Sequence, residues 1–305
     1  MDRAPLTRFA WLSIAAAVLT IGLKTAAFLL TGSVGLLSDA LESLVNLAGA
    51  IMALAMLTIA ARPADDDHPY GHGKAEYFSS GVEGTLILLA AVSIAVAAIA
   101  RLLHPQPLEA VGIGLLVSGG AAIVNLLVAL ILLRAARHHG SITLEANGHH
   151  LLTDVWTSVG VIAGIGLVVW TRWHWLDAVV ALVVAANIVW TGTRIVRQSV
   201  IGLMDAAMSD PERQAVQLAL LPHLSGGIQY HALRTRISGV RRFVSLHVLV
   251  PGDWTVHQGH ELLERMEADI RHAVPNTTVL THLESLEDPS SWDDITLDRA
   301  EAVRE

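Results

Sequence analysis

The sequence predicts a bundle of six transmembrane helices followed by a small soluble domain of mixed α and β structure. Three observations support this class: 53% of the 305 residues are hydrophobic, 16% are charged, and the mean hydropathy is +0.52. A soluble domain would carry about 25% charged residues. The charges are scarce up to about residue 200 and dense after it, so two physical regimes share the chain. The net charge of −8 argues against a nucleic-acid partner.

Six stretches are apolar enough to cross a bilayer, which takes roughly 20 residues for about 30 Å of hydrocarbon. They cover residues 9–30, 34–60, 79–103, 108–134, 150–171 and 175–196. Eight basic residues flank the spans on one side, against Arg101 and Arg172 on the other. Basic residues favour the cytoplasmic side. We therefore expect an integral membrane protein with both termini in the cytoplasm. A bacterial inner membrane is the expected location, because no segment resembles an organelle-targeting sequence.

The charged part of the chain predicts a compact α+β module in the order α-β-β-α-β. The predicted elements are a helix over 211–223, strands over 228–236 and 241–250, a helix over 256–273 and a strand over 277–284. The first helix begins at Ser209-Asp210-Pro211, a good cap with proline in the first turn. The expected domains are thus a six-span transmembrane domain over 1–203, a cytoplasmic domain over 204–288 and an acidic, disordered tail over 289–305.

Polar residues inside two spans are the first candidate for chemistry. Glu42 and Asn46 lie four residues apart, as do His150 and Asp154. This spacing puts each pair on one helix face. If the two faces meet, four nitrogen and oxygen ligands converge, which suits a tetrahedral divalent ion. The alternative is that His150 and Asp154 sit at the membrane interface while Glu42 pairs with Lys24.

Two further groups could bind metal, and since the chain has no cysteine, the strong ligands are His, Asp and Glu. Asp65, His68 and His72 lie in one predicted cytoplasmic loop beside glycines, although a polar loop with histidines is common. The second group lies in the soluble module: His231, His247, His260, His282 and Glu284. His282 and Glu284 share a strand face, because side chains alternate with period two. Each of these histidines alone would more often be an ordinary surface residue.

At these residues the sequence resembles the cation diffusion facilitator family, over about residues 7–284. The resemblance rests on the segments GSVGLLSDALESLVN from Gly32, DHPYGHGKAE from Asp67, HHLLTD from His149 and HALRTRISG from His231. It implies a homodimeric six-helix transporter in membrane lipid that exports Zn²⁺ or a related divalent ion in exchange for protons. It does not imply an enzyme.

The resemblance also implies roles for individual residues. Glu42, Asn46, His150 and Asp154 would form the transport site, and Asp65, His68 and His72 a loop site. The metal cluster of the cytoplasmic domain would consist of His231, His247, His260, His282 and Glu284. Lys74 and Asp205 match a charge pair between the subunits.

One departure from the family pattern affects the choice of metal. Well-characterised zinc members carry His or Asp where Glu42 stands, and Asp where Asn46 stands, so this site has two carboxylates rather than three. Harder oxygen donors favour Mn²⁺, Fe²⁺ or Co²⁺, whereas the imidazole still suits Zn²⁺. We keep Zn²⁺ as the first candidate.

Two other classes of function fit the sequence less well. A membrane-anchored metal sensor without transport would have no use for paired polar residues inside spans. An intramembrane hydrolase is not supported, because the sequence has no His-Glu-x-x-His or Gly-x-Ser-x-Gly motif. Glu83, inside the third span, stays unassigned: it could assist proton transfer or pair with Lys24.

Overall fold

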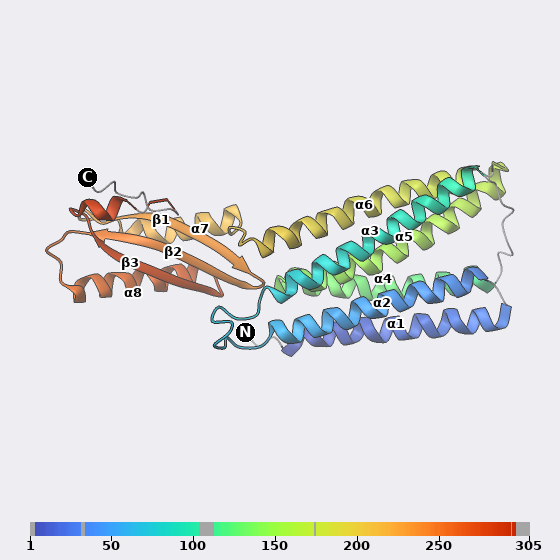
Figure 1. The fold of residues 1–305 in the computed structure, drawn as a ribbon, viewed down its shortest axis with the longest axis horizontal. Coiled ribbons are helices and arrows are strands. Elements are labelled where there is room, and N and C mark those ends of the chain that lie inside the picture. Colours follow the sequence, from blue (N-terminus) through green and yellow to red (C-terminus); the bar gives the residue numbers. More distant parts are fainter. Residues whose placement is uncertain (1–3, 32–33, 104–112, 174, 294, 297–305) are drawn as a thin grey trace. The chain divides into compact units, whose positions relative to one another are not determined.

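The computed structural model describes residues 4–31, 34–103, 113–173, 175–293 and 295–296; for some helical residues, Glu42 among them, the side chain is not described. The chain divides into two compact units, one up to Leu203 and one from Met204. We call them the helical unit and the C-terminal unit. Among the described residues, the helical unit has six long helices (Figure 1): α1 Ala4–Thr31, α2 Val34–Ala60, α3 Ala75–Leu103, α4 Ile113–His139, α5 Ile142–Thr171 and α6 Trp175–Leu203.

The helical unit has the surface of a membrane protein. Within the described residues, four helical stretches are long and apolar enough to span a bilayer: Leu6–Leu29, Ala75–Leu103, Leu116–His139 and Ala178–Leu203. Large apolar side chains point outward, and Leu89, Val96 and Leu127 are 60%, 63% and 57% exposed. Such a surface suits lipid rather than water. The number of six spans stays a prediction, because α2 and α5 are not among these four stretches.

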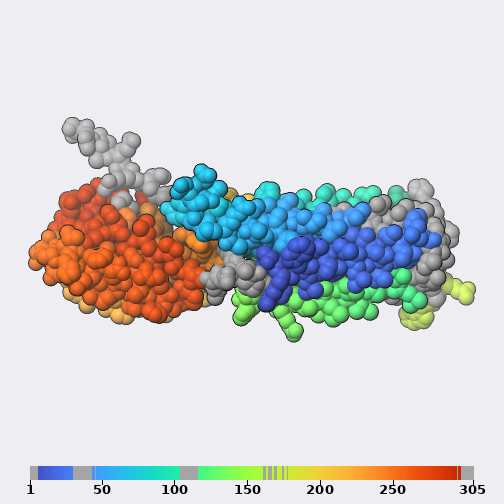
Figure 2. Space-filling model, turned by 90° about the horizontal axis from the view of Figure 1, so that it is seen from below, coloured from blue at the N-terminus to red at the C-terminus, as the bar shows by residue number. Residues whose placement is uncertain are grey.

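Small residues allow the helices of this unit to approach closely. A Cβ atom added to Gly202 of α6 would lie 2.2 Å from the ring of Tyr77 on α3, and one added to Gly84 of α3 would lie 2.9 Å from Val196 on α6. This is the way that helices pack in membranes, where small residues bring backbones together. On the face shown in Figure 2, α1 lies between α2 and α4.

Helix α5 begins at Ile142, eight residues before the expected start of the fifth span at residue 150. The early turns contain polar residues, which predict a loop, but the fold gives them partners. The Ser13 hydroxyl donates to Asn147 over 3.1 Å, and the Thr143 hydroxyl donates to the carbonyl of Glu76 over 3.1 Å. Eight residues at 1.5 Å each place His150 about 12 Å along the helix. His150 is therefore well inside α5, not at its end.

The C-terminal unit has the predicted order of elements. These are α7 Asp210–Leu220, β1 Gln229–Ser238, β2 Arg241–Val250, α8 Val256–Ala273 and β3 Thr277–Ser285. Its described residues form one three-stranded sheet in the order β1-β2-β3, in which β1 and β2 are antiparallel and β2 and β3 parallel. A parallel return needs a crossover connection, which α8 provides.

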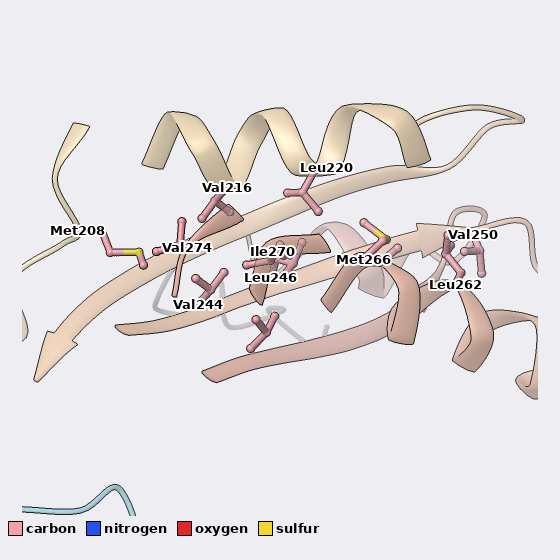
Figure 3. Close-up of a cluster of buried hydrophobic side chains, with 12 residues drawn as sticks. Met208, Val216, Leu220, Val244, Leu246, Val250, Leu262, Met266, Ile270 and Val274 are labelled. Atoms are coloured by element: carbon pink, nitrogen blue, oxygen red, sulfur yellow. The ribbon is translucent and has the colours of Figure 1, made fainter. Parts of the chain in front are cut away.

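Alternation along β2 separates a covered face of the sheet from an open one. Val244 and Leu246 point to Val216 of α7 and to Met266 and Ile270 of α8, as Figure 3 shows. Leu246, Met266 and Ile270 are fully buried. Both helices therefore cover the same face. Odd-numbered residues of β2 point to the other face.

The packed part of this unit extends past residue 288, where the sequence predicts a loose tail. Residues Pro289–Trp292 form a 3₁₀ turn. The Trp292 indole donates to the carbonyl of Leu286 over 3.3 Å, and its ring packs edge-on against His231 at 5.7 Å between centroids. Arg234 donates to the carbonyls of Ile295 and Thr296. This segment therefore lies against the open face of the sheet.

Candidate metal centre

Three of the predicted transport-site residues meet between α2 and α5. The Asn46 amide lies between the other two side chains: its Oδ1 is 2.6 Å from His150 Nε2, and its Nδ2 donates to Asp154 Oδ2 over 2.5 Å. His150 is only 6% exposed. We call Asn46, His150 and Asp154 the helical site. The side chain of Glu42 lies outside the described residues.

Two residues that we did not predict for this site complete its surroundings. Asn125 of α4 donates to Asp154 Oδ2 over 3.1 Å, and Glu83 of α3 has its Oε2 3.0 Å from His150 Nδ1. Their side chains are 5% and 1% exposed. A carboxylate inside a span is a signal of function that the sequence does carry. A single asparagine in an apolar helix carries no comparable signal.

The loop group is brought together around a turn before α3. The Asp65 carboxylate accepts from the backbone of His68 over 2.7 Å, and its oxygens lie 3.2 Å from His68 Nδ1 and 3.3 Å from His72 Nε2. Gly71 supplies the positive φ of 81° that the turn requires. Desolvation raises the pKa of the Asp65 carboxyl, but hydrogen bonds from His68 outweigh it, so the pKa lies below its ordinary value. These groups could hold one ion near the surface.

The sheet cluster, which we define as His231, His247 and Glu284, lies on the open face of the sheet. His231 of β1 pairs with His247 of β2 in the ladder, and their ring nitrogens are 3.2 Å apart. The Glu284 oxygens lie 3.0 Å from His231 Nε2 and 3.1 Å from His247 Nδ1. One ligand atom from each of the three residues lies within 4.8 Å of the others, so they could bind one divalent ion.

The other two histidines predicted for this cluster differ in position. His282 pairs with His247 across β2 and β3, but its side chain is 66% exposed and its Nε2 is 3.5 Å from Glu284. His260 lies on α8, which packs against the covered face of the sheet. No hydrogen bond or ion pair joins His260 to the sheet cluster within the described residues. In a single chain, His260 therefore stands apart from it.

Lys74 and Asp205, predicted as a pair between subunits, each have a partner within their own unit. The Lys74 ammonium donates to the carbonyl of Leu203 at the end of α6 over 3.1 Å. The Asp205 carboxylate accepts from Arg236 over 3.2 Å. A cation near a helix C-terminus stabilises the exposed carbonyls there. The pair between subunits stays a prediction.

Comparisons with known proteins match both units. Residues 10–204 match the family model of the cation efflux transmembrane domain, and residues 208–286 match that of the cytoplasmic domain of cation efflux proteins. An uncharacterised transporter of a Synechocystis species is 50% identical over 284 residues, which cover 93% of this chain and 92% of that protein. The cation-efflux pump FieF of Klebsiella pneumoniae is 31% identical over 279 residues, covering 92% of this chain and 90% of the pump.

The match to FieF extends to Escherichia coli, whose pump is 30% identical over 287 residues, covering 93% of each protein. The two family models together take in nearly the whole described chain, including the helical site, the loop group and the sheet cluster. The chain therefore belongs to the cation diffusion facilitator family of cation efflux transporters.

Proposed function

We propose that this protein exports a divalent metal ion through the helical site, by alternating access and in exchange for protons. The observation that supports it best is the contact of Asn46 on α2 with both His150 and Asp154 on α5. The polar faces of two helices meet there, and an imidazole, an amide and a carboxylate come within a few ångströms of one another. A helix that only anchors a protein has no need of such a contact.

Protons are the proposed counter-substrate because of the chemistry of the ligands. A metal ion binds neutral imidazole and ionised carboxylate, so it competes with protons for His150 and Asp154. Binding of the metal releases protons, and protonation releases the metal. A carrier that presents this site alternately to the two sides therefore exchanges one for the other.

Zn²⁺ is the first candidate for the metal, with Fe²⁺, Mn²⁺ and Co²⁺ as alternatives. His150 supplies the nitrogen that zinc favours, whereas Asn46 supplies a neutral oxygen in place of a carboxylate. Asn125, which contacts Asp154, adds a second amide to the surroundings. Because most of these groups offer oxygen rather than nitrogen, Fe²⁺, Mn²⁺ and Co²⁺ remain alternatives to Zn²⁺.

We propose further that the protein works as a homodimer in lipid, in the bacterial inner membrane, with both termini in the cytoplasm. The match to a family of dimerising cytoplasmic domains supports the dimer. The sheet cluster and the loop group would bind metal to regulate transport, and the charge pair of Lys74 and Asp205 would join the subunits. His260 and His282 are the remaining candidates for the cytoplasmic metal site.

The test is a metal panel in proteoliposomes. Purified protein is reconstituted with indicators for metal and pH inside the vesicles, and Zn²⁺, Fe²⁺, Mn²⁺ and Co²⁺ are added in turn. Asp154→Ala should abolish the metal flux and the proton counterflux together. Thr171→Ala is the matched control, because its hydroxyl bonds to the carbonyl of Leu167 on the same helix, away from the helical site, and it should transport normally.

Other outcomes of the proteoliposome test distinguish transport through the helical site from the alternative functions. Intact flux in Asp154→Ala would contradict the assignment of the site. Metal binding by the C-terminal unit without flux of any ion in the wild type would favour the membrane-anchored sensor. Asn46→Asp, which restores a third carboxylate, should shift the preference toward Zn²⁺.

A further inference from the structure

Glu83 is a buried carboxylate whose contacts the proposed mechanism has not yet used. It lies on α3 and is 1% exposed. Gly49 of α2 leaves the space for it, because a Cβ at that position would lie 3.0 Å from Glu83 Oε1. On its other side, Glu83 Oε2 is 3.0 Å from His150 Nδ1. Glu83 therefore lies at the place where α2 and α5 meet α3.

Glu76 is a second buried carboxylate of α3, and its structural role offers a comparison with Glu83. Glu76 is also fully buried on α3, and it accepts a hydrogen bond of 2.6 Å from the Ser141 hydroxyl. Within the described residues, no donor makes a well-aligned hydrogen bond to either oxygen of Glu83. The nitrogen that its carboxylate contacts is that of His150. Burying a carboxylate without well-aligned donors costs free energy of folding. We therefore expect Glu83 to have a function, and its contact with His150 indicates where.

The two nitrogens of His150 face different neighbours. Nε2 faces Asn46 and so the helical site, whereas Nδ1 faces Glu83. A histidine that binds metal through one ring nitrogen commonly donates its other N–H to a carboxylate, which fixes the tautomer and the orientation of the ring. Glu83 Oε2, 3.0 Å from Nδ1, is close enough to accept that N–H once the ring and the carboxylate are aligned.

We propose that Glu83 is a positioning residue of the transport site: it holds a proton on Nδ1 of His150, so that Nε2, which donates to the Asn46 oxygen when no ion is bound, is the nitrogen that loses its proton and binds the metal. This inference rests on the proposed function, because it assumes that the helical site binds the ion. It assigns a role to a residue on a third helix.

The test measures Co²⁺ binding by visible absorption, in the full chain with His72→Ala and His247→Ala present to weaken the loop group and the sheet cluster. In this background Glu83→Ala should weaken Co²⁺ binding by about 10–100-fold, the usual effect of losing the carboxylate behind a ligand. Glu83→Gln keeps an oxygen that can accept the N–H, and it should restore most of the affinity. The shape of the cobalt bands should stay unchanged, because the ligands are the same.

Glu76→Gln is the matched control, since it alters a buried carboxylate of the same helix away from His150, and its Co²⁺ affinity should equal that of the background. Wild-type affinity in Glu83→Ala, or a change in the band shape, would overturn the positioning role. Asp154→Ala serves to tell the two proposals apart. If it abolishes binding while Glu83→Ala does not, only the inference about Glu83 fails; if it leaves binding unchanged, the transport site itself is wrong.

Discussion

The helical site and the sheet cluster bring similar ligands together in two different ways. In the helical site, Asn46 and His150 are 104 residues apart and meet through the packing of separate helices. In the sheet cluster, His231 and His247 are directly paired in a strand ladder. A site between helices changes when the helices move, whereas a site on a ladder keeps its geometry while the strands stay paired. The first suits an ion that must be released and the second an ion that is retained.

The largest expected effect comes from removing one histidine of each site. His150→Ala should reduce Zn²⁺ flux in proteoliposomes by more than 100-fold, because even indirect loss of ligand support costs about 10–100-fold in affinity. His247→Ala should leave residual transport and weaken the proposed regulation by metal at the sheet cluster. Equal loss of flux in both variants would refute the division of roles.

The core beneath the sheet offers a second comparison. Leu246→Ala, at a fully buried position of β2, should destabilise the C-terminal unit by about 2–5 kcal/mol. Leu280→Ala on β3, where the side chain is 69% exposed, should change stability by less than about 0.5 kcal/mol. Limited proteolysis of the full chain over a temperature series measures both. Cleavage within the helical unit at the same temperature would show that the two units do not unfold separately.

The contact of α3 and α6 tests how strongly close helix packing stabilises the helical unit. Gly202→Ala brings a methyl group against Tyr77 and should cost about 1–3 kcal/mol, as overpacking usually does. Gly22→Ala on α1, where the added carbon meets nothing within 4 Å, should cost no stability. Thermal unfolding in detergent gives the comparison. A stable Gly202→Ala protein would mean that these helices can part without penalty.

The smallest expected effect is a pH dependence confined to the C-terminal unit. Desolvation raises the pKa of Glu212, but hydrogen bonds from Ser209 and Arg242 outweigh it, and the pKa lies below its ordinary value. A lowered pKa stabilises the fold above the ordinary glutamate pKa of about 4.3, and this stability is lost as the pH falls through the folded-state value. Glu212→Gln should flatten the acid side of the stability curve, by about 1 kcal/mol or less because the pair is partly exposed.

Much of the C-terminal unit could be predicted from the sequence. The strand over 241–250 and the helix over 256–273 have the predicted bounds, because alternation and a strong cap are local signals. The turn around Trp292 could not be predicted, since its acidic neighbours indicate a loose tail. Its order comes from contacts with the sheet that are distant in sequence.

In the helical unit, by contrast, much of the surroundings of the site could not be predicted from the sequence. The four-residue spacing of His150 and Asp154 is visible in the sequence, but the early turns of α5 contain polar residues whose partners lie on other helices. The role of Glu83 depends on a histidine 67 positions later on another helix. Asn125 reaches Asp154 from α4 in the same way. Such contacts depend on tertiary packing, which spacing along one helix does not reveal.

The row formed by His231, His247 and His282 across the three strands has a consequence for folding. A strand that paired one residue out of step would turn its histidine into the hydrophobic layer and a core residue into water. Metal bound to the sheet cluster, which includes two residues of this row, would stabilise only the correctly aligned sheet, because a ligand favours the state that binds it. Metal binding would thus favour the native register over a slipped one.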